Sequence, residues 1–160
     1  GDERCYPVGH AERNDTMITA KLFSQQAISS QKGASKNFFP IPAELGPEQG
    51  AEVFSALLDA TAGMDIVVLG MGEDGHTASL FPGNVALDDL RSAVPVYDAP
   101  KAPLERISIG LSTLRNAGEC IVIATGENKR EALAKLKEGA VLPVGLVDAD
   151  VWFVDEAAAP

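Results

Sequence analysis

Residues 65–83 have the sequence DIVVLGMGEDGHTASLFPG, and this stretch indicates the fold class most directly. Its apolar, β-branched run at 66–69 predicts a buried strand. A glycine-rich loop with Asp74 and His76 follows, and the turn at 77–81 could begin a helix. Because open α/β sheets hold their ligands just beyond the carboxyl ends of the strands, we expect a functional site in this loop.

The rest of the chain alternates between strand-like and helical patterns. Runs at 107–111, 121–124 and 151–154 are mostly continuous in apolar residues, as expected for strands covered on both faces. Trp152 and Phe153 are expected in the core. Helices are predicted at 15–25, 47–61 and 129–137 from apolar residues at helical spacing. These residues are Met17, Ile18, Leu22 and Ile28 in or near the first helix, Val53, Phe54, Leu57 and Leu58 in the second, and Leu133 and Leu136 in the third.

Boundary signals complete the predicted architecture. Asn14 is the expected N-cap of the first helix, and segments 26–46 and 83–105, rich in Pro, Gly, Ser and Ala, are predicted surface loops. The order of elements predicts a single α/β domain over residues 1–160, with an open, mainly parallel sheet flanked by helices on both faces.

Composition narrows the classes of partner. The formal net charge of −10 argues against nucleic acid or an anionic membrane surface, although it leaves room for a small anionic substrate held by a few local cations. Cys5 and Cys120 offer neither a disulfide framework nor metal-ligand spacing. No stretch approaches the roughly 20 apolar residues of a membrane span, so we expect a cytoplasmic protein.

Asp74 and His76 form the first candidate for chemistry. A neutral imidazole can take a proton from water, and a carboxylate beside it can fix the tautomer and stabilise the imidazolium that forms. Gly70, Gly72 and Gly75 allow sharp turns and could offer amide N–H groups to an anion. From the spacing alone, a loop whose histidine merely caps a following helix is equally compatible.

Two further groups of charged residues are candidates. On pattern alone the cluster Asp2-Glu3-Arg4 is more often a solvated chain end, although the apolar, proline-fixed continuation Cys5-Tyr6-Pro7 suggests a loop packed into the body. Arg106 precedes a strand and Lys129 begins a helix, positions where cations and helix amides form anion sites, although each alone is more often a surface charge. The pattern G-x-G-x-x-G at 70–75 would suit a dinucleotide, but no acidic residue ends a following strand and Pro82 would interrupt the helix.

Together these segments resemble the 6-phosphogluconolactonase family, within the wider group that includes glucosamine-6-phosphate deaminases. Residues 70–83 are similar to the family's signature loop almost residue for residue. The segment 2–14 resembles its D-E-R-x-x-P…N motif, 106–108 its R-I-S strand, 126–129 its G-x-x-K turn, and 142–143 with 152–158 its C-terminal end. Family members carry a further N-terminal segment with a phosphate-holding loop, so we expect this chain to be truncated and incomplete as a catalyst.

The resemblance implies hydrolysis of 6-phosphogluconolactone to 6-phosphogluconate in the oxidative pentose phosphate pathway. It implies that His76 activates water and that Asp74 orients its ring. Arg4 would stabilise substrate charge or the oxyanion, and Asp2 would help to order the site.

The same resemblance implies a substrate-binding set and an absence of cofactors. Arg106 and Lys129 would contact the phosphate, with Gly72, Gly75 and Asn14 completing the set. Lactone hydrolysis requires no redox cofactor and no metal. An unpaired sheet edge could cause association, so we expect a monomer or a weak homodimer.

Two alternatives have the same fold. In the deaminase branch the signature histidine is followed by an Asn-Glu-Pro pattern, whereas here residues 77–82 contain no glutamate, which favours hydrolysis. A non-catalytic sugar-phosphate sensor is the second alternative. Retention of Arg4, Asp74, His76 and Lys129 in one chain argues against it, because a sensor needs no general base.

Overall fold

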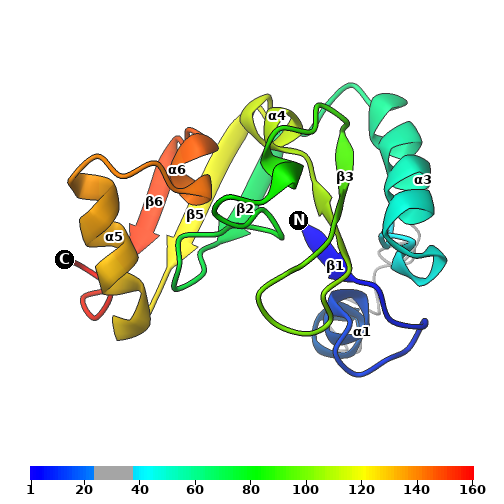
Figure 1. The fold of residues 1–160 in the computed structure, drawn as a ribbon, viewed down its shortest axis with the longest axis horizontal. Helices are drawn as coiled ribbons and strands as arrows, with labels where there is room; N and C mark the ends of the chain where they lie inside the picture. The colour runs from blue at the N-terminus through cyan, green and yellow to red at the C-terminus, as the bar shows by residue number, and fades with distance from the viewer. Residues whose placement is uncertain (24–37) are drawn as a thin grey trace.

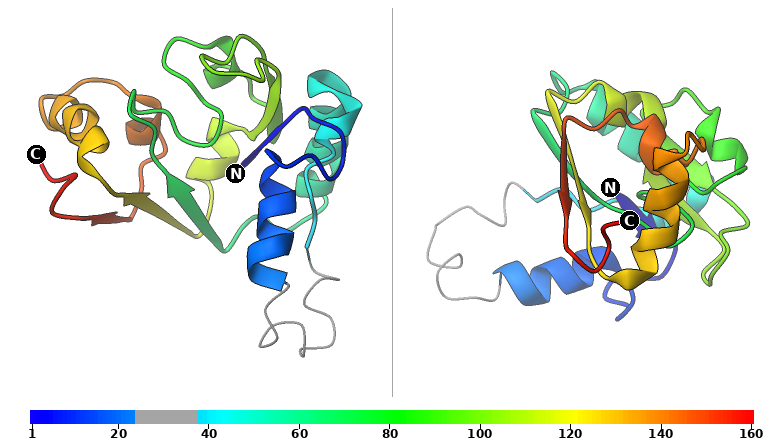
Figure 2. Two further views of the ribbon diagram at one scale, coloured as in Figure 1. Left: turned by 90° about the horizontal axis from the view of Figure 1, so that it is seen from below. Right: turned by 90° about the vertical axis from the view of Figure 1, so that its left-hand side faces the viewer.

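The computed structural model of the protein describes residues 1–23 and 38–160, which form two three-stranded sheets (Figure 1). The first sheet is parallel, in the order β2 (Ile66–Gly70), β5 (Glu119–Ala124) and β6 (Val151–Val154). Helices α5 (Arg130–Lys137) and α6 (Pro143–Leu146) lie on one face of it, as the edge-on view in Figure 2 shows. This sheet confirms the predicted α/β class.

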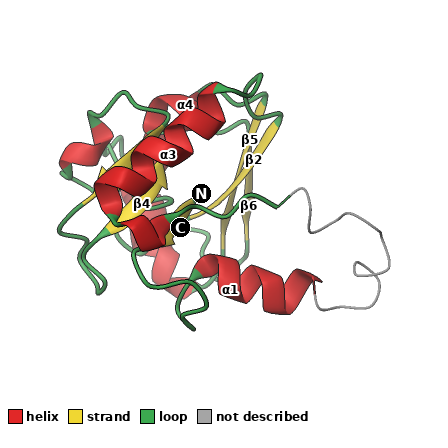
Figure 3. Cartoon of the chain, turned by 90° about the vertical axis from the view of Figure 1, so that its right-hand side faces the viewer, coloured by secondary structure: helices red, strands yellow, loops and turns green. Residues whose placement is uncertain are grey.

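The second sheet is antiparallel and was not predicted. Its order is β1 (Asp2–Arg4), β4 (Arg106–Ile109) and β3 (Ala93–Val96). Helix α3 (Pro47–Asp59) packs on this sheet (Figure 3). The Ser55 hydroxyl of α3 donates to the Ala93 carbonyl and accepts from the Ala93 N–H. The antiparallel sheet therefore has its own covering helix.

Short helical segments connect these elements. They are α1 (Asn14–Ile18) with the π-helical turn η1 (Thr19–Phe23), η3 (Ala43–Leu45), η4 (Val85–Leu87), α4 (Leu111–Arg115) and η5 (Glu127–Lys129). In the part of the chain that is described, no helix has the length and apolar character needed to cross a membrane.

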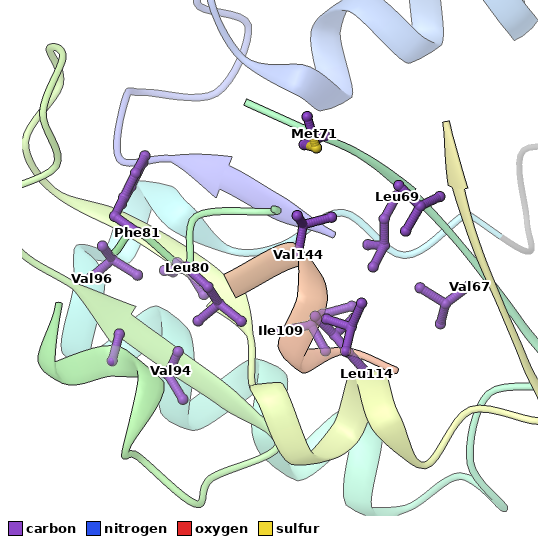
Figure 4. Close-up of a cluster of buried hydrophobic side chains, with 14 of the residues drawn as sticks. Val67, Leu69, Met71, Leu80, Phe81, Val94, Val96, Ile109, Leu114 and Val144 are labelled. Carbon is purple, nitrogen blue, oxygen red and sulfur yellow. The ribbon is translucent and has the colours of Figure 1, made fainter. Parts of the chain in front are cut away.

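One buried cluster joins the two sheets (Figure 4). It includes Val67 and Leu69 from β2, Val94 and Val96 from β3, Ile109, and side chains from the connecting segments: Leu80, Phe81, Leu114 and Val144. Because burial of apolar surface contributes about 25 cal/mol per Å², this shared core fixes the loop after β2 against both sheets.

The predicted strands are largely confirmed. Runs 66–69, 121–124 and 151–154 are strands, whereas 107–111 is shifted: β4 begins at Arg106, and Leu111 already belongs to α4. The prediction of a loop at 83–105 missed β3. That strand contains Pro95, which is tolerated because β3 is an edge strand and needs no ladder hydrogen bond from that residue on its free side.

The predicted helices at 47–61 and 129–137 are also confirmed, with Pro47 in the first turn of α3 and Gly139 (φ 92°) just after α5. In α3 the buried side contains Phe54 and Ser55, while Val53 and Leu57 are exposed. The turn at 77–81 does not begin a helix, because Ala78 adopts a φ of 49°.

The first predicted helix differs in its start. Asn14 is its first residue and not its cap, and Met17 and Leu22 are exposed. Ile28 and the end of the predicted range 15–25 lie outside the described residues.

The expectation that the parallel strands are covered on both faces is wrong for the described residues. Burial alternates along β2, where Val67 and Leu69 are buried but Ile66 and Val68 are 59% and 58% exposed. Phe153, expected in the core, is 58% exposed, whereas Trp152 packs against the core as expected. Side chains that alternate along a strand point to opposite faces, so this sheet has one buried and one exposed apolar face.

Candidate active site

Residues 70–83, called the glycine loop here, leave the carboxyl end of β2 and fold back on themselves. The Gly72 N–H donates to the His76 carbonyl at 2.8 Å, and the Gly75 N–H donates to the Gly72 carbonyl at 3.1 Å. The Thr77 hydroxyl donates to the Gly70 carbonyl at 2.8 Å. These hydrogen bonds fix the backbone that carries Asp74 and His76.

Two glycines of this loop are required by close approach. A Cβ atom at Gly72 would lie 2.0 Å from His76 Nδ1 and 2.8 Å from Asp74 Oδ1. Gly75 has a φ of 82°, and its Cβ would lie 2.7 Å from Leu142 Cδ1. Gly72 therefore makes room for the side chains of Asp74 and His76, while Gly75 allows the turn between them.

Asp74 and His76 form a hydrogen-bonded pair. His76 Nδ1 lies 2.5 Å from Asp74 Oδ1, which also accepts the backbone N–H of His76 at 3.1 Å. Burial raises the pKa of the Asp74 carboxyl, but the hydrogen bonds from the His76 backbone and ring outweigh it, so the net pKa lies below the ordinary value.

This pairing determines the tautomer of the ring. An ionised carboxylate can only accept, so Nδ1 of His76 carries the proton, and the neutral ring presents the lone pair of Nε2. Among the described residues, none hydrogen-bonds to Nε2. The helix-capping alternative is wrong, because no helix follows His76 in the glycine loop. The arrangement suits a general base.

The Phe81 ring contacts the imidazole of His76, and Phe81 was not predicted as a site residue. The ring centroids of Phe81 and His76 lie 4.6 Å apart. The Arg106 guanidinium carbon lies 5.5 Å from the Phe81 centroid. Phe81 is buried and contacts both polar side chains. Its position in the glycine loop was the available signal, but its apolar character pointed only to the core.

Arg4 and Asn14 meet beside the glycine loop. Arg4 Nη1 donates to the Glu12 carbonyl at 2.8 Å and to Asn14 Oδ1 at 3.4 Å. Asn14 Nδ2 donates to the Asp2 carbonyl at 2.8 Å. Asn14 thus positions the Arg4 side chain and ties α1 to β1.

The Asp2-Glu3-Arg4 cluster is a packed strand and not a solvated chain end. Glu3 is 2% exposed, and its carboxylate accepts the backbone N–H groups of Arg4, Asn14 and Asp15, each at 2.8 Å. The last two are at the start of α1, so Glu3 performs the capping that was predicted for Asn14. A cap supplied by a residue eleven positions away leaves no local sequence signal.

Asp2 links β1 to the glycine loop. Its Oδ2 accepts from the Ser79 hydroxyl at 2.7 Å, and the Ser79 N–H donates to the Ser108 hydroxyl at 3.2 Å. Ser79 and Ser108 are both fully buried. Asp2 therefore anchors the loop that carries His76 to the antiparallel sheet.

Arg106 is buried, and its guanidinium donates to two backbone carbonyls, those of Pro103 at 3.2 Å and Lys101 at 2.8 Å. Burial lowers its pKa, and the nearby charge of Arg4 lowers it further, although Asp2 opposes the shift. The Arg106 guanidinium contacts backbone carbonyls only, and no described carboxylate lies close enough to neutralise its charge.

A cavity of about 630 Å³ unites these groups. It is lined by every predicted site residue except Gly75, and also by Glu73, Phe81 and Lys101, which were not predicted. Glu73 and Lys101 come from exposed loops, and only the folded chain brings them to the site. In the described ranges no group of three or more His, Cys, Asp or Glu side chains could hold a metal ion.

Four cations line this cavity, and they come from separate parts of the chain. Within residues 1–23 and 38–160, no carboxylate oxygen lies within 4.0 Å of Arg4, Lys101, Arg106 or Lys129. Carboxylates pair directly with Arg13, Arg91 and Lys135, which lie outside the cavity. Cations without a described carboxylate partner, gathered around one cavity, are suited to an anionic ligand.

Comparison with known proteins identifies relatives over the whole chain. Residues 1–155 match the family described as glucosamine-6-phosphate isomerases/6-phosphogluconolactonase. The 6-phosphogluconolactonases of Rattus norvegicus and Homo sapiens are both 35% identical to it, over 99% of this chain and 65% of theirs. The chain thus spans about two thirds of the length of these relatives.

Solved structures with a similar fold include members of the same family. The crystal structure of a devB protein has a TM-score of 0.83 at 28% identity and covers 99% of this chain and 70% of its own. A 6-phosphogluconolactonase from Thermotoga maritima has a TM-score of 0.82 at 25% identity, with 96% and 69% covered. A monomeric glucosamine-6-phosphate deaminase, at 22% identity and a TM-score of 0.58 over 69% of this chain and 53% of its own, shares the fold.

Proposed function

Because this chain belongs to the glucosamine-6-phosphate isomerase/6-phosphogluconolactonase family, we propose that the protein hydrolyses 6-phosphogluconolactone to 6-phosphogluconate. The observation that carries the proposal is the Asp74–His76 pair, with Nε2 unbonded among the described residues, in a cavity ringed by cations that have no described carboxylate partner. The reaction class is ester hydrolysis, and it requires no redox step.

In the proposed mechanism His76 Nε2 takes a proton from water as the oxygen attacks the lactone carbonyl carbon. A tetrahedral intermediate forms, and Arg4 stabilises its oxyanion. When the carbon–oxygen bond of the ring breaks, the imidazolium returns the proton to the leaving ring oxygen. Asp74 holds the Nδ1 proton throughout, so the ring keeps its orientation.

Arg106 and Lys129 are proposed to bind the phosphate group, because both line the cavity without a carboxylate partner among the described residues. Asn14 positions Arg4, and Asp2 anchors the glycine loop, so their proposed roles are indirect. Gly72 provides the space in which the Asp74–His76 pair forms.

The test is turnover of the lactone, measured as acid release at constant pH and corrected for spontaneous hydrolysis. We expect His76→Ala to lower kcat roughly 10²–10⁴-fold while phosphosugar binding is retained. His10→Ala is the matched control, since His10 is exposed and outside the cavity. Near-normal turnover by His76→Ala would exclude the proposed role.

Assays with other ligands separate the alternatives. Ammonia release from glucosamine-6-phosphate without acid release from the lactone would indicate a deaminase. Tight phosphosugar binding without turnover would indicate a sensor. Of these, the hydrolase is favoured by the glycine loop, whose residues 77–82 contain no glutamate to shuttle a proton.

We also propose a cytoplasmic location and a monomeric or weakly dimeric state. The exposed apolar residues of β2 support association between copies of the chain. Location varies among relatives, since one from Arabidopsis thaliana is named chloroplastic. Fractionation and sedimentation at several protein concentrations test both proposals.

A further inference from the structure

Three charged side chains from separate segments line the same cavity. Glu73 belongs to the glycine loop, Lys101 to the connection between β3 and β4, and Lys129 to η5. Glu73 Oε1 accepts a hydrogen bond from Asn128 Nδ2 at 2.9 Å, which places the carboxylate next to the residue that precedes Lys129. The family comparison and the signature motifs assign no role to Glu73 or Lys101.

Both lysines act on this carboxylate. The hydrogen bond from Asn128 lowers the pKa of Glu73, and the charges of Lys101 and Lys129 lower it further. Neither ammonium group is within 4.0 Å of a described carboxylate, so the interaction is a through-space attraction and not a closed ion pair. The two lysines therefore keep their donors available to a ligand.

Lys101 is also coupled to Arg106. The Arg106 guanidinium donates to the Lys101 backbone carbonyl at 2.8 Å and to the Pro103 carbonyl at 3.2 Å. A buried cation thus fixes the backbone from which the Lys101 side chain extends. This contact places the Lys101 backbone next to the Arg106 guanidinium, and both residues line the cavity.

We propose that Lys101 is a third phosphate-binding cation, and that Glu73 competes with the substrate's phosphate for Lys101 and Lys129. This proposal rests on the proposed function, because it assigns further residues to the same site. A phosphate monoester brings negative charge close to Glu73, so the carboxylate weakens its binding. Substrate and product both carry the phosphate, and weaker ground-state binding of both favours release of product.

The two residues therefore have opposite effects, which a purely structural role would not produce. Lys101→Met removes a charge-assisted contact and should weaken binding of inorganic phosphate and of 6-phosphogluconate roughly tenfold. Glu73→Gln keeps an oxygen that can accept from Asn128 but removes the charge. It should tighten binding about two- to fivefold, the range for exposed charge interactions.

Isothermal titration with both probes, at low and high salt, is the experiment. Lys137→Met and Glu52→Gln are matched controls, because both residues are exposed and outside the cavity. We expect the controls to bind like the parent protein and the effects of both variants to shrink in high salt. Unchanged binding by Lys101→Met, or weaker binding by Glu73→Gln, overturns the proposal.

Kinetics separate this proposal from the proposed function. If the protein hydrolyses the lactone, Lys101→Met should raise KM about tenfold and leave kcat unchanged, as expected for uniform binding. If it hydrolyses no lactone but the two variants shift phosphate binding in opposite directions, the proposed function fails and the phosphate assignment stands. If it hydrolyses the lactone but neither variant shifts phosphate binding, the phosphate assignment fails and the proposed function stands.

Discussion

Replacing Gly72 by alanine tests the geometry of the Asp74–His76 pair most directly. The added Cβ would lie 2.0 Å from His76 Nδ1, where ordinary contacts are 3.4 Å or longer, so the ring must move by roughly 1 Å or more. A displacement of this size costs on the order of 100-fold in rate, or about 2.7 kcal/mol of transition-state stabilisation. The φ of Gly72 lies outside the left-handed region, so its backbone can accept alanine without strain.

The assay compares kcat for lactone hydrolysis with the thermal midpoint of unfolding and with the affinity for inorganic phosphate. We expect kcat to fall about 100-fold while phosphate affinity stays within about twofold, since the cations are untouched. Gly70→Ala is the matched control, because a Cβ there meets no atom within 4 Å. Unchanged kcat in a stably folded Gly72→Ala protein would refute the assignment of His76 as the base.

Three further predictions address the supports of the site. The pKa of Asp74 is depressed, so its ionised form contributes stability above its unfolded-state pKa, and that contribution is lost as pH falls through the folded-state pKa. His76→Phe keeps the burial but removes the ring hydrogen bond, so NMR titration should show a higher Asp74 pKa; an equal or lower value contradicts the cause given. Glu3→Gln should lower the free energy of unfolding by about 2–3 kcal/mol in urea titrations, because a buried carboxylate that accepts three N–H groups loses its charge. A loss below about 0.5 kcal/mol would contradict that role. Phe81→Leu should lower kcat/KM by about tenfold, since ring contacts of this kind contribute roughly 0.5–1.5 kcal/mol each. Phe81→Tyr keeps the aromatic ring and should retain kcat/KM, so an equal loss in both variants would contradict a role for the ring contacts.

The sequence predicted the glycine loop and its strand because their signals are local. Glycines at Gly72 and Gly75, between an apolar run and a histidine, reflect steric needs that arise within a few residues. Helices α3 and α5 were predicted for the same reason: Pro47 and Gly139 mark a start and a stop in the backbone itself.

What the sequence did not reveal depends on contacts between distant segments. Glu3 caps α1 from eleven residues away, and β1 is a strand only because it pairs with β4. The continuous apolar run at 66–69 could not show which face is covered, since burial depends on the elements packed against each side. Lys101 reaches the site through the backbone held by Arg106, a contact that no spacing rule predicts.

The charge of the whole chain and the charge of the site have opposite signs, and this has a consequence for binding. At a net charge of −10 the protein repels an anionic substrate at long range, but such repulsion is screened beyond about 10 Å at 0.1 M salt. The cations of the site act over a few ångströms inside the cavity, where screening is weak. Affinity for the substrate should therefore depend on short-range contacts and not on electrostatic steering. Composition alone argued against a polyanionic partner, but the sign of the field in the cavity depends on which cations lack a carboxylate neighbour, and only the fold determines that.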